Sequence, residues 1–222
     1  MLGSARKDYA GGKKMNVQNK KVPQLMLPRG FAGRLALMGM NIGHKSIYRN
    51  VAKVLEPKPE DDLLDVGCGN GYFLKKYASR VHSIAGLDLS ELCVKMAKEK
   101  HRDRIKAGTA EFVQGEASQL PWEDNKFSVV TTMGSFVGFS KPLESLKEMR
   151  RVLRPGGRAV VSVEWNVEDG LDHTKEVKQW RMWLWTEADV RAMMEEAGFS
   201  GISVTYVKVF KMPKMMIVCG LK

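Results

Sequence analysis

Residues 63–71 of this 222-residue chain read Leu63-Leu64-Asp65-Val66-Gly67-Cys68-Gly69-Asn70-Gly71. The short apolar run is typical of a buried strand, and the alternating glycines predict a tight turn in which backbone can approach a ligand closely. A second apolar run, residues 84–87, ends at Asp88. Two carboxylates therefore stand at the carboxyl ends of two predicted strands, which is where open α/β sheets bind ligands.

These residues favour a nucleoside cofactor with a cationic amino-acid part over a dinucleotide. The dinucleotide fingerprint is G-x-G-x-x-G, and its third glycine would fall on Tyr72. Asp65 would lie unfavourably close to a pyrophosphate, whereas it suits an ammonium group. S-adenosylmethionine (SAM) has an ammonium, a sulfonium and no phosphate, and Asp88 can accept hydrogen bonds from its ribose hydroxyls. Glycines that serve packing alone would leave the two acids unexplained.

Further segments continue the pattern in a fixed order. They are Gly86-Leu87-Asp88-Leu89-Ser90, Phe112-Val113-Gln114-Gly115-Glu116-Ala117 with Leu120-Pro121-Trp122, Phe127-Ser128-Val129-Val130, and Glu148-Met149-Arg150-Arg151-Val152-Leu153-Arg154-Pro155-Gly156-Gly157. In this order the chain resembles the class I SAM-dependent methyltransferases, most closely the branch with the ubiquinone/menaquinone biosynthesis enzymes. The resemblance is strong over residues 45–165. Its motifs are specific for SAM binding and unspecific for the methyl acceptor.

The resemblance implies a set of cofactor-binding residues, with S-adenosylhomocysteine (SAH) as the product. The set is Asp65, Gly67, Cys68, Gly69, Gly71, Asp88, Leu89, Glu116, Ala117, Thr132 and Met133. Asp88 is expected to hold the ribose, and Asp65 with the glycine turn the methionine part. Glu116 takes the place of the family's aspartate after the third strand, where it would accept from the adenine amino group.

The alternation of strand and helix patterns predicts an α/β fold. We expect a doubly wound, mostly parallel, seven-stranded Rossmann-like sheet with a C-terminal antiparallel hairpin. The predicted strands are 62–66, 82–88, 110–114, 127–133, 158–164, 201–210 and 214–221. The predicted helices are 44–55, 70–79, 90–100, 142–153 and 186–197. Ser90 is a plausible N-cap, Thr186 with Asp189 can form a capping box, and residues 154–157 indicate a turn.

Composition predicts one methyltransferase domain, residues 22–222, behind a basic arm at residues 1–21. The domain divides into a lid or cover (22–55), a SAM-binding core (56–165) and a substrate-side cover with the hairpin (166–222). No transmembrane run or signal core stands out, and three distant cysteines without metal-ligand spacing favour a reducing, cytoplasmic setting without metal.

Net charge is +11, and the arm holds six basic residues and one acidic residue. The arm is expected to be disordered, because it has few apolar residues. A basic arm can attract nucleic acid or an anionic membrane, so peripheral membrane contact stays open, and a solubilising tail is an equal alternative. The oligomeric state is not indicated.

Two segments outside the core are expected to hold the acceptor. Residues 22–43 are apolar but interrupted by four glycines, which predicts a mobile lid too broken for a stable isolated helix. Residues 165–185 hold four of the five tryptophans. The two segments would line one apolar cavity above the sulfonium. Ordinary packing of cover segments is the alternative for both.

The catalytic residues are unknown from sequence. Methyl transfer depends largely on positioning, and it needs a general base only if the acceptor carries a proton. The weak candidates are His173, with Asp172 and Glu164 beside it, and Tyr48. A lone histidine in a loop is more often a solvated surface residue, and core packing explains Tyr48 equally well.

Three functions remain open from the sequence. The first is methylation of a small, apolar or aromatic acceptor at an O, N or C atom. The second is methylation of RNA or protein with the basic arm as docking element, so nucleic acid is a possible but not favoured partner. The third is a catalytically silent SAM-binding partner protein. Residues 131–134 lack the Asn-Pro-Pro-Tyr-like device of amino-group methylation, and no Pro-Cys pair suits attack on cytosine.

Overall fold

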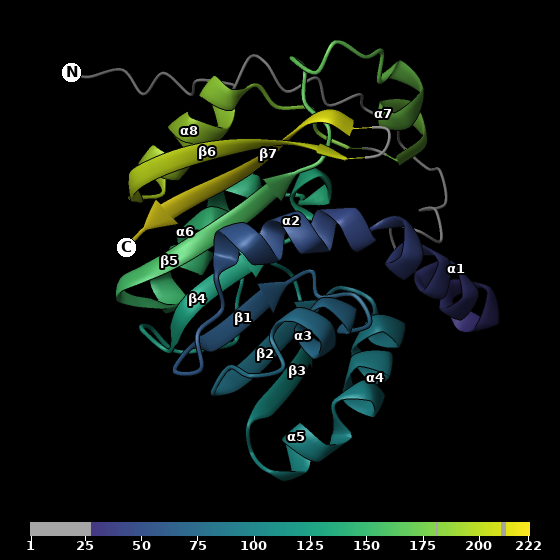
Figure 1. The fold of residues 1–222 in the computed structure, drawn as a ribbon, viewed down its shortest axis with the longest axis vertical. Helices are drawn as coiled ribbons and strands as arrows, with labels where there is room; N and C mark the ends of the chain where they lie inside the picture. The colour runs from purple at the N-terminus through teal and green to yellow at the C-terminus, as the bar shows by residue number, and fades with distance from the viewer. Residues whose placement is uncertain (1–27, 181, 210–211) are drawn as a thin grey trace.

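The structure is a computed structural model that describes residues 28–180, 182–209 and 212–222. In this part of the chain seven strands form one sheet in the order β3-β2-β1-β4-β5-β7-β6 (Figure 1). The strands are β1 (Asp62–Val66), β2 (Ser83–Asp88), β3 (Ala110–Gln114), β4 (Phe127–Thr132), β5 (Leu153–Val163), β6 (Ser200–Val209) and β7 (Met212–Leu221). The predicted fold class is confirmed.

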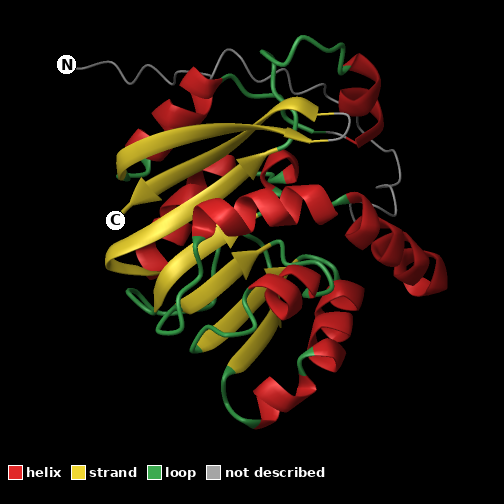
Figure 2. Cartoon of the chain, viewed as in Figure 1, coloured by secondary structure: helices red, strands yellow, loops and turns green. Residues whose placement is uncertain are grey.

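Helices cover the sheet on both sides (Figure 2). They are α1 (Gly30–Gly43), α2 (Lys45–Leu55), α3 (Tyr72–Tyr77), α4 (Glu91–Lys100), α5 (Arg102–Lys106), the 3-10 turn η1 (Phe136–Gly138), α6 (Pro142–Val152), α7 (Thr174–Trp180) and α8 (Glu187–Glu196). The five helices expected from sequence are present with ends that shift by one or two residues. None of the helices in the described ranges is both long and apolar enough to cross a membrane.

Successive strand residues point to opposite faces, and this alternation builds two hydrophobic cores. In β1, Leu63 packs beneath α2, α3 and α4, whereas Leu64 packs beneath α6 and α8. The neighbouring strand β4 repeats the division with Val129 and Val130. A strand that is buried on both faces has apolar residues at successive positions instead of an apolar–polar alternation. This explains why residues 63–66 are apolar apart from Asp65.

β7 is antiparallel to both of its neighbours, β5 and β6. The other described pairings are parallel, so the expected C-terminal hairpin supplies the reversed strand. Local caps also match the sequence. Ser90 Oγ accepts from the backbone N–H of Cys93 at 3.4 Å, and Thr186 and Asp189 form the expected capping box before α8.

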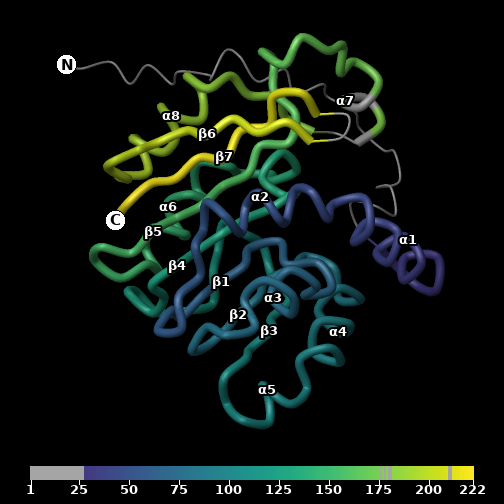
Figure 3. Tube along the Cα trace, viewed as in Figure 1, coloured from purple at the N-terminus to yellow at the C-terminus, as the bar shows by residue number. Residues whose placement is uncertain are grey.

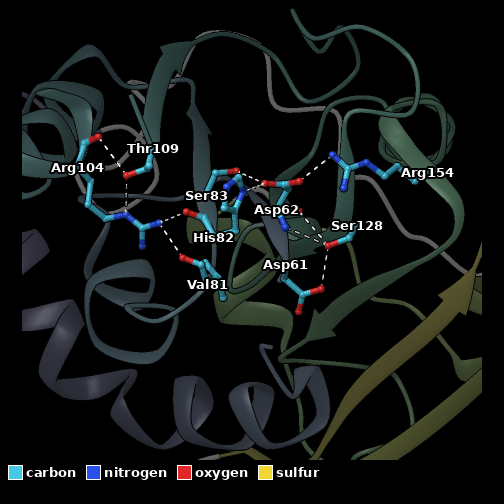
Figure 4. A network of polar contacts seen from close by, with 9 residues as sticks. All are labelled: Asp61, Asp62, Val81, His82, Ser83, Arg104, Thr109, Ser128 and Arg154. Carbon is cyan, nitrogen blue, oxygen red and sulfur yellow. Dashed lines mark hydrogen bonds and ion pairs between the residues drawn. The ribbon is translucent and has the colours of Figure 1, made fainter. Parts of the chain in front are cut away.

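A polar network fixes the strand starts, at the edge of the sheet opposite the glycine turn (Figure 4). Asp62 accepts from Ser83, His82 and Arg154, and Ser128 joins β4 to Asp61 at 2.8 Å. Arg158 of β5 pairs with Asp61 at 2.8 Å and donates to the backbone oxygen of Leu55 at the end of α2. These contacts join the end of α2 and four strands, β1, β2, β4 and β5, in one polar network.

The structure corrects two local predictions. The turn predicted at residues 154–157 lies inside β5, where the register against β4 shifts and Gly156 adopts a φ of +76°. Gly156 and Gly157 pair with Lys222 at the end of β7, so the sheet absorbs the irregularity as a bulge. The segment expected to be too broken for a stable isolated helix contains the 14-residue helix α1, which was absent from the predicted helices.

α1 is held against α4 rather than against the sheet (Figure 3). Its buried residues are Gly33 and Leu37. A Cβ at Gly33 would lie 3.1 Å from the Leu92 side chain, so glycine permits the close approach of the two helices. Arg34 reaches Glu99 at 3.4 Å, and the backbone oxygen of Pro28 accepts from Ser90 Oγ at 2.8 Å. Tertiary contact therefore overrides the weak intrinsic propensity of this segment.

Candidate functional site

A cavity of about 260 Å³ opens where β1, β2 and β4 end. One wall is the glycine turn after β1 together with Asp88 at the end of β2. The opposite wall comes from α1 and α2. The cavity thus lies at the carboxyl edge of the sheet, where β1 separates strands that run to either side and where α/β folds bind their ligands.

Asp88 is held in a fixed orientation. Its two carboxyl oxygens accept the backbone N–H groups of Gly69 at 2.8 Å and Ser90 at 2.9 Å. Burial raises the pKa of Asp88, while these two hydrogen bonds act in the opposite direction. Each oxygen keeps a further lone pair, so the carboxylate can accept from a ligand's hydroxyl groups.

Asp65 is buried with no partner for its Oδ1 atom. Burial and then the neighbouring charge of Asp88 raise the pKa of Asp65 well above its ordinary value. A buried carboxyl without a partner is costly, and it is stabilised by a cation that enters the cavity. This orphaned oxygen, on a residue that lines the cavity, fits the ammonium group of SAM.

The glycine turn needs its glycines at two positions. Gly67 has a φ of +80°, and a Cβ there would collide with the Ser135 side chain. Gly71 has a φ of +69°, and a Cβ there would lie 3.0 Å from His101 Nε2, which itself bonds to the Gly71 oxygen at 2.9 Å. The turn is therefore shaped by contacts with distant residues as well as by its own backbone.

Most predicted cofactor residues line this cavity. The residues that do so are Asp65, Gly67, Cys68, Gly69, Asp88, Leu89, Glu116, Ala117 and Met133. Gly71 and Thr132 lie outside the lining: Gly71 packs on His101, and Thr132 is buried with an unpartnered hydroxyl. Sequence reasoning missed Ser118, Gly134 and Ser135, which follow β3 and β4 and line the same space.

The wall opposite the turn includes Tyr48 and part of the segment expected to hold the acceptor, but Asn41 and His44 were not predicted as site residues. Leu37, Asn41, His44 and Tyr48 follow one another at spacings of three or four residues, so one side of α1 and α2 faces the cavity. Leu37 is apolar, whereas Asn41 and His44 are polar groups that can orient a ligand. A signal was present in this spacing, but the glycines between residues 30 and 43 obscured the helical pattern.

His44 is the cavity's histidine. Burial lowers its pKa, so the imidazole is neutral near pH 7 and can accept a proton. Its ring meets Tyr48 edge-on, with the centroids 5.8 Å apart. A Cβ at Gly134 would lie 3.7 Å from His44 Cε1, so the backbone that follows β4 passes close to the ring.

The structure divides the catalytic candidates of the sequence. Tyr48 lines the cavity, but burial and the charges of Asp65 and Glu164 raise its pKa, so its hydroxyl can donate a hydrogen bond and does not act as a base. Glu164 is buried behind the lining, where its Oε1 accepts from the Gly134 N–H at 2.9 Å and from Ser162. The Oε2 atom of Glu164 has no partner, and burial raises the pKa of the Glu164 carboxyl.

His173 is buried, so the expectation of a solvated surface residue is wrong. It is also absent from the residues that line the cavity. Its Nε2 bonds to Asp169 at 2.8 Å, and both side chains are buried. Asp172 caps α7 through the backbone N–H of Thr174. His173 thus pairs with Asp169, Asp172 accepts from the Thr174 N–H, and Glu164 accepts from Gly134 and Ser162, so the structure gives the three candidates different hydrogen-bond partners.

The tryptophan segment does not line this cavity either. Trp183 and Trp185 stack at 5.1 Å in the core beside α6 and α8, and Trp183 Nε1 donates to the Phe139 oxygen. Trp165 packs near His173. The expectation that residues 165–185 share one cavity with α1 is wrong for these three, and the Trp180 side chain lies outside the described structure.

Comparison with known proteins agrees with this geometry. Residues 64–161 match the methyltransferase domain family. The chain is 34% identical over 121 residues to the ubiquinone/menaquinone biosynthesis C-methyltransferase UbiE of Ectopseudomonas mendocina, covering 53% of this chain and 47% of that protein. It is 36% identical over 120 residues to the demethylmenaquinone methyltransferase of Staphylococcus carnosus, covering 53% and 48%. The chain spans about half the length of the curated relatives it matches.

A solved structure has a similar fold. It is the complex between the Haloferax volcanii Trm112 methyltransferase activator and a methyltransferase, which matches with a TM-score of 0.72 and 21% identity. The match covers 86% of this chain and 94% of the other. At this identity the likeness shows the fold and not the acceptor.

Proposed function

We propose, from the premise that residues 64–161 form a class I SAM-dependent methyltransferase domain, that this protein transfers a methyl group from SAM to a small, apolar or aromatic acceptor. The premise is the family match, and the family's cofactor is SAM. The proposal rests on one observation: a single cavity joins the acidic, glycine-lined strand ends to a wall on α1 and α2 in which apolar side chains, Leu37 and Met40, lie beside the polar groups of Asn41, His44 and Tyr48.

The acidic side of the cavity suits SAM. Asp88, oriented by two backbone N–H groups, would accept from the ribose hydroxyls, and Asp65 would face the ammonium group. Glu116 and Ala117, which follow β3, would border the adenine. When bound, SAM supplies an electrophilic methyl carbon whose bond to sulfur breaks with both electrons left on a neutral thioether.

The α1–α2 side suits the acceptor. Leu37 and Met40 offer apolar surface, and Asn41 can hydrogen-bond a polar substituent. His44 would take the proton that a phenol, an aromatic N–H or an acidic C–H must lose, and it would then release that proton to water. Tyr48 would stay protonated and donate a hydrogen bond.

Cofactor binding is tested by calorimetry on the full-length protein. SAM and SAH should bind tightly, and NADH should bind weakly or not at all, because a pyrophosphate would meet the Asp65 carboxyl. Tight NADH binding would overturn the cofactor assignment. Mass spectrometry of ligands that co-purify with the protein would identify the acceptor.

The role of His44 is tested with His44→Gln in a panel of hydroxylated and amino aromatics, with SAH formation as the readout. Turnover should fall about 10²–10⁴-fold, while SAH affinity stays unchanged. The wild-type rate should fall as the pH drops below the ordinary histidine range, since protonated His44 cannot accept a proton. His82→Gln is the control, because His82 is exposed at the far edge of the sheet.

Two outcomes would replace this proposal. Turnover of RNA or protein substrates, with none across the small-molecule panel, would assign a macromolecular acceptor. SAM binding without turnover of any acceptor would assign a silent SAM-binding partner. If the pH profile of His44→Gln matched that of the wild type, His44 would not be the general base. The acceptor would then be one that needs no proton removed by the protein.

A further inference from the structure

The outer face of α1 carries an unusual run of exposed apolar side chains. Phe31, Leu35, Met38 and Ile42 are 76%, 53%, 60% and 77% exposed. Their spacing of four, three and four residues places them on one face of the helix, which we call the α1 stripe. Buried Gly33 and Leu37 lie on the opposite face, against α4 and the cavity. Scattered exposed apolar residues are ordinary, but a contiguous row marks a contact surface.

The same segment is strongly basic. Residues 28–55, which comprise α1 and α2, contain five arginine or lysine residues and no aspartate or glutamate. Lys45, Arg49 and Lys53 are exposed on α2. Arg34 pairs with Glu99 of α4. An exposed apolar row on a segment that contains cations and no carboxylates of its own is typical of a helix that lies at a lipid surface.

We propose that the α1 stripe docks this protein on an anionic lipid bilayer, with the stripe in the headgroup–acyl boundary and the cations of α2 over the headgroups. α1 stands at the outer edge of the molecule, beyond α2 and α4 (Figure 1). Its buried face lines the cavity while its exposed face meets the lipid. Only the thickness of this helix would then lie between the lipid and the cavity. An apolar acceptor dissolved in the bilayer would therefore have a short path to the site.

Charge argues for lipid over the other possible occupants. A second copy docked through the same stripe would bring two segments of five cations together without a carboxylate in either. The chain's own basic arm, residues 1–21, has six basic residues and one acidic residue, so it would add positive charge to positive charge. An anionic bilayer instead offers complementary charge and an apolar interior.

The test is flotation of the full-length protein with vesicles of phosphatidylcholine alone, or of three parts phosphatidylcholine to one part phosphatidylglycerol. The protein should float with the anionic vesicles and not with the neutral ones, and added salt should reduce the bound fraction. The double variant Leu35→Gln/Ile42→Gln should bind roughly ten-fold more weakly or worse. The affinity of Arg49→Gln/Lys53→Gln for anionic vesicles should fall roughly five-fold for each cation removed.

Matched variants separate the stripe from other causes. Val167→Gln/Leu171→Gln removes two apolar side chains that are about half exposed outside the stripe, and it should float like the wild type. Replacing Lys13, Lys14, Lys20 and Lys21 by glutamine should reduce binding only modestly. Calorimetry with SAH should be unchanged in the stripe variant, so loss of docking is distinguishable from loss of the proposed cofactor site.

Three results would overturn the proposal. The first is a wild-type protein that does not float with anionic vesicles. The second is binding that survives Leu35→Gln/Ile42→Gln but disappears with the arm variant, which would assign docking to residues 1–21. The third is a wild-type dimer by light scattering that becomes a monomer in the stripe variant, without vesicle binding by either, which would make the stripe an interface between copies.

Discussion

Asp65 and Asp88 end neighbouring strands, but the protein holds them in opposite ways. Asp88 accepts two backbone hydrogen bonds that fix its carboxylate, whereas Asp65 is buried with an unpartnered oxygen. The first arrangement preorganises an acceptor for neutral hydroxyl groups. The second stores an unfavourable interaction that a cationic ligand would relieve.

Asp88→Ala should weaken SAH binding by roughly 1.5–3 kcal/mol, because it removes a charged hydrogen-bond acceptor. Calorimetry measures this directly, and Asp103→Ala, an exposed carboxylate on α5, serves as the control. A variant at position 88 that binds SAH as tightly as the wild type would contradict the ribose assignment.

Asp65→Asn should stabilise the ligand-free protein and weaken SAH binding. The folded-state pKa of Asp65 is raised, so the folded protein binds more protons than the unfolded chain and stability falls as pH rises from about 4 through that pKa. Above it the variant should be more stable by roughly 1–3 kcal/mol, and below about pH 4 the advantage should vanish. Denaturant unfolding at several pH values checks this.

The same residue should couple SAH binding to proton release, because a bound ammonium group lowers the pKa of Asp65. Calorimetry in buffers of different ionisation enthalpy should show released protons in the wild type and fewer in Asp65→Asn. Equal proton release by both proteins would place the ammonium elsewhere.

Residues whose role depends on their own strand and turn could be predicted from sequence. Asp65, Asp88 and the glycines form such a local pattern, and the cavity contains most of them. Asn41 could not, because it lies on α1, a helix that packs against α2 and α4 and that the local pattern did not predict. His44 lies at the start of the predicted helix 44–55, but nothing in its own neighbourhood indicated that it would face the cavity. The grouping of His173 with Glu164 failed because proximity in sequence does not report which partner, here Asp169, a buried side chain meets.

At the scale of elements, α1 and β5 depart from the local pattern for related reasons. Four glycines weaken α1, yet Gly33 also allows the close approach to Leu92 that holds the helix. The turn-like residues 154–157 are drawn into β5 because β7 provides partners for Gly156 and Gly157. In both cases contacts with a distant segment outweigh intrinsic preference.

Residues 22–43 remain a predicted lid, of which residues 22–27 lie outside the described structure. α1 should exchange its amide hydrogens more slowly once SAH and an acceptor fill the cavity, because Leu37 and Met40 line that cavity. Hydrogen exchange detected by mass spectrometry measures this, with β4 as an internal reference. Equally strong protection of α1 with and without ligands would make the segment a fixed cover.

Arg158 should be important for stability in acid. Burial alone would raise the pKa of Asp61, but hydrogen bonds from Arg158, the Lys58 backbone and Ser128 outweigh it, and the pKa lies below its ordinary value. This stabilisation is present above the unfolded-state pKa and is lost as pH falls through the folded-state pKa.

Arg158→Met should therefore cost roughly 1–3 kcal/mol near pH 7, after allowance for the partial exposure of the pair. The cost should shrink in acid, which urea unfolding at several pH values would show. Lys126→Met, which removes an exposed ion pair with Glu111, should change stability by less than about 0.5 kcal/mol.

For the whole molecule, the order of motifs predicted the seven-stranded sheet because each motif marks one strand end in a doubly wound fold. The cavity wall on α1 and α2, which we propose to hold the acceptor, could not be predicted in the same way, since it lies outside the matched residues 64–161. The positive charge is likewise concentrated outside that domain, in residues 1–21 and 28–55.

Removing residues 1–21 should leave turnover of a small acceptor nearly intact, because the described lining of the cavity begins at Pro28. The same turnover should change little with added salt, since an apolar acceptor releases no counterions on binding. Phosphate contacts do release them, so activity on RNA would fall steeply as salt rises. Steady-state assays of both proteins over a salt series separate the two cases. Loss of turnover on truncation, together with a steep salt dependence on RNA, would assign the arm to a macromolecular acceptor and remove the small molecule from this site.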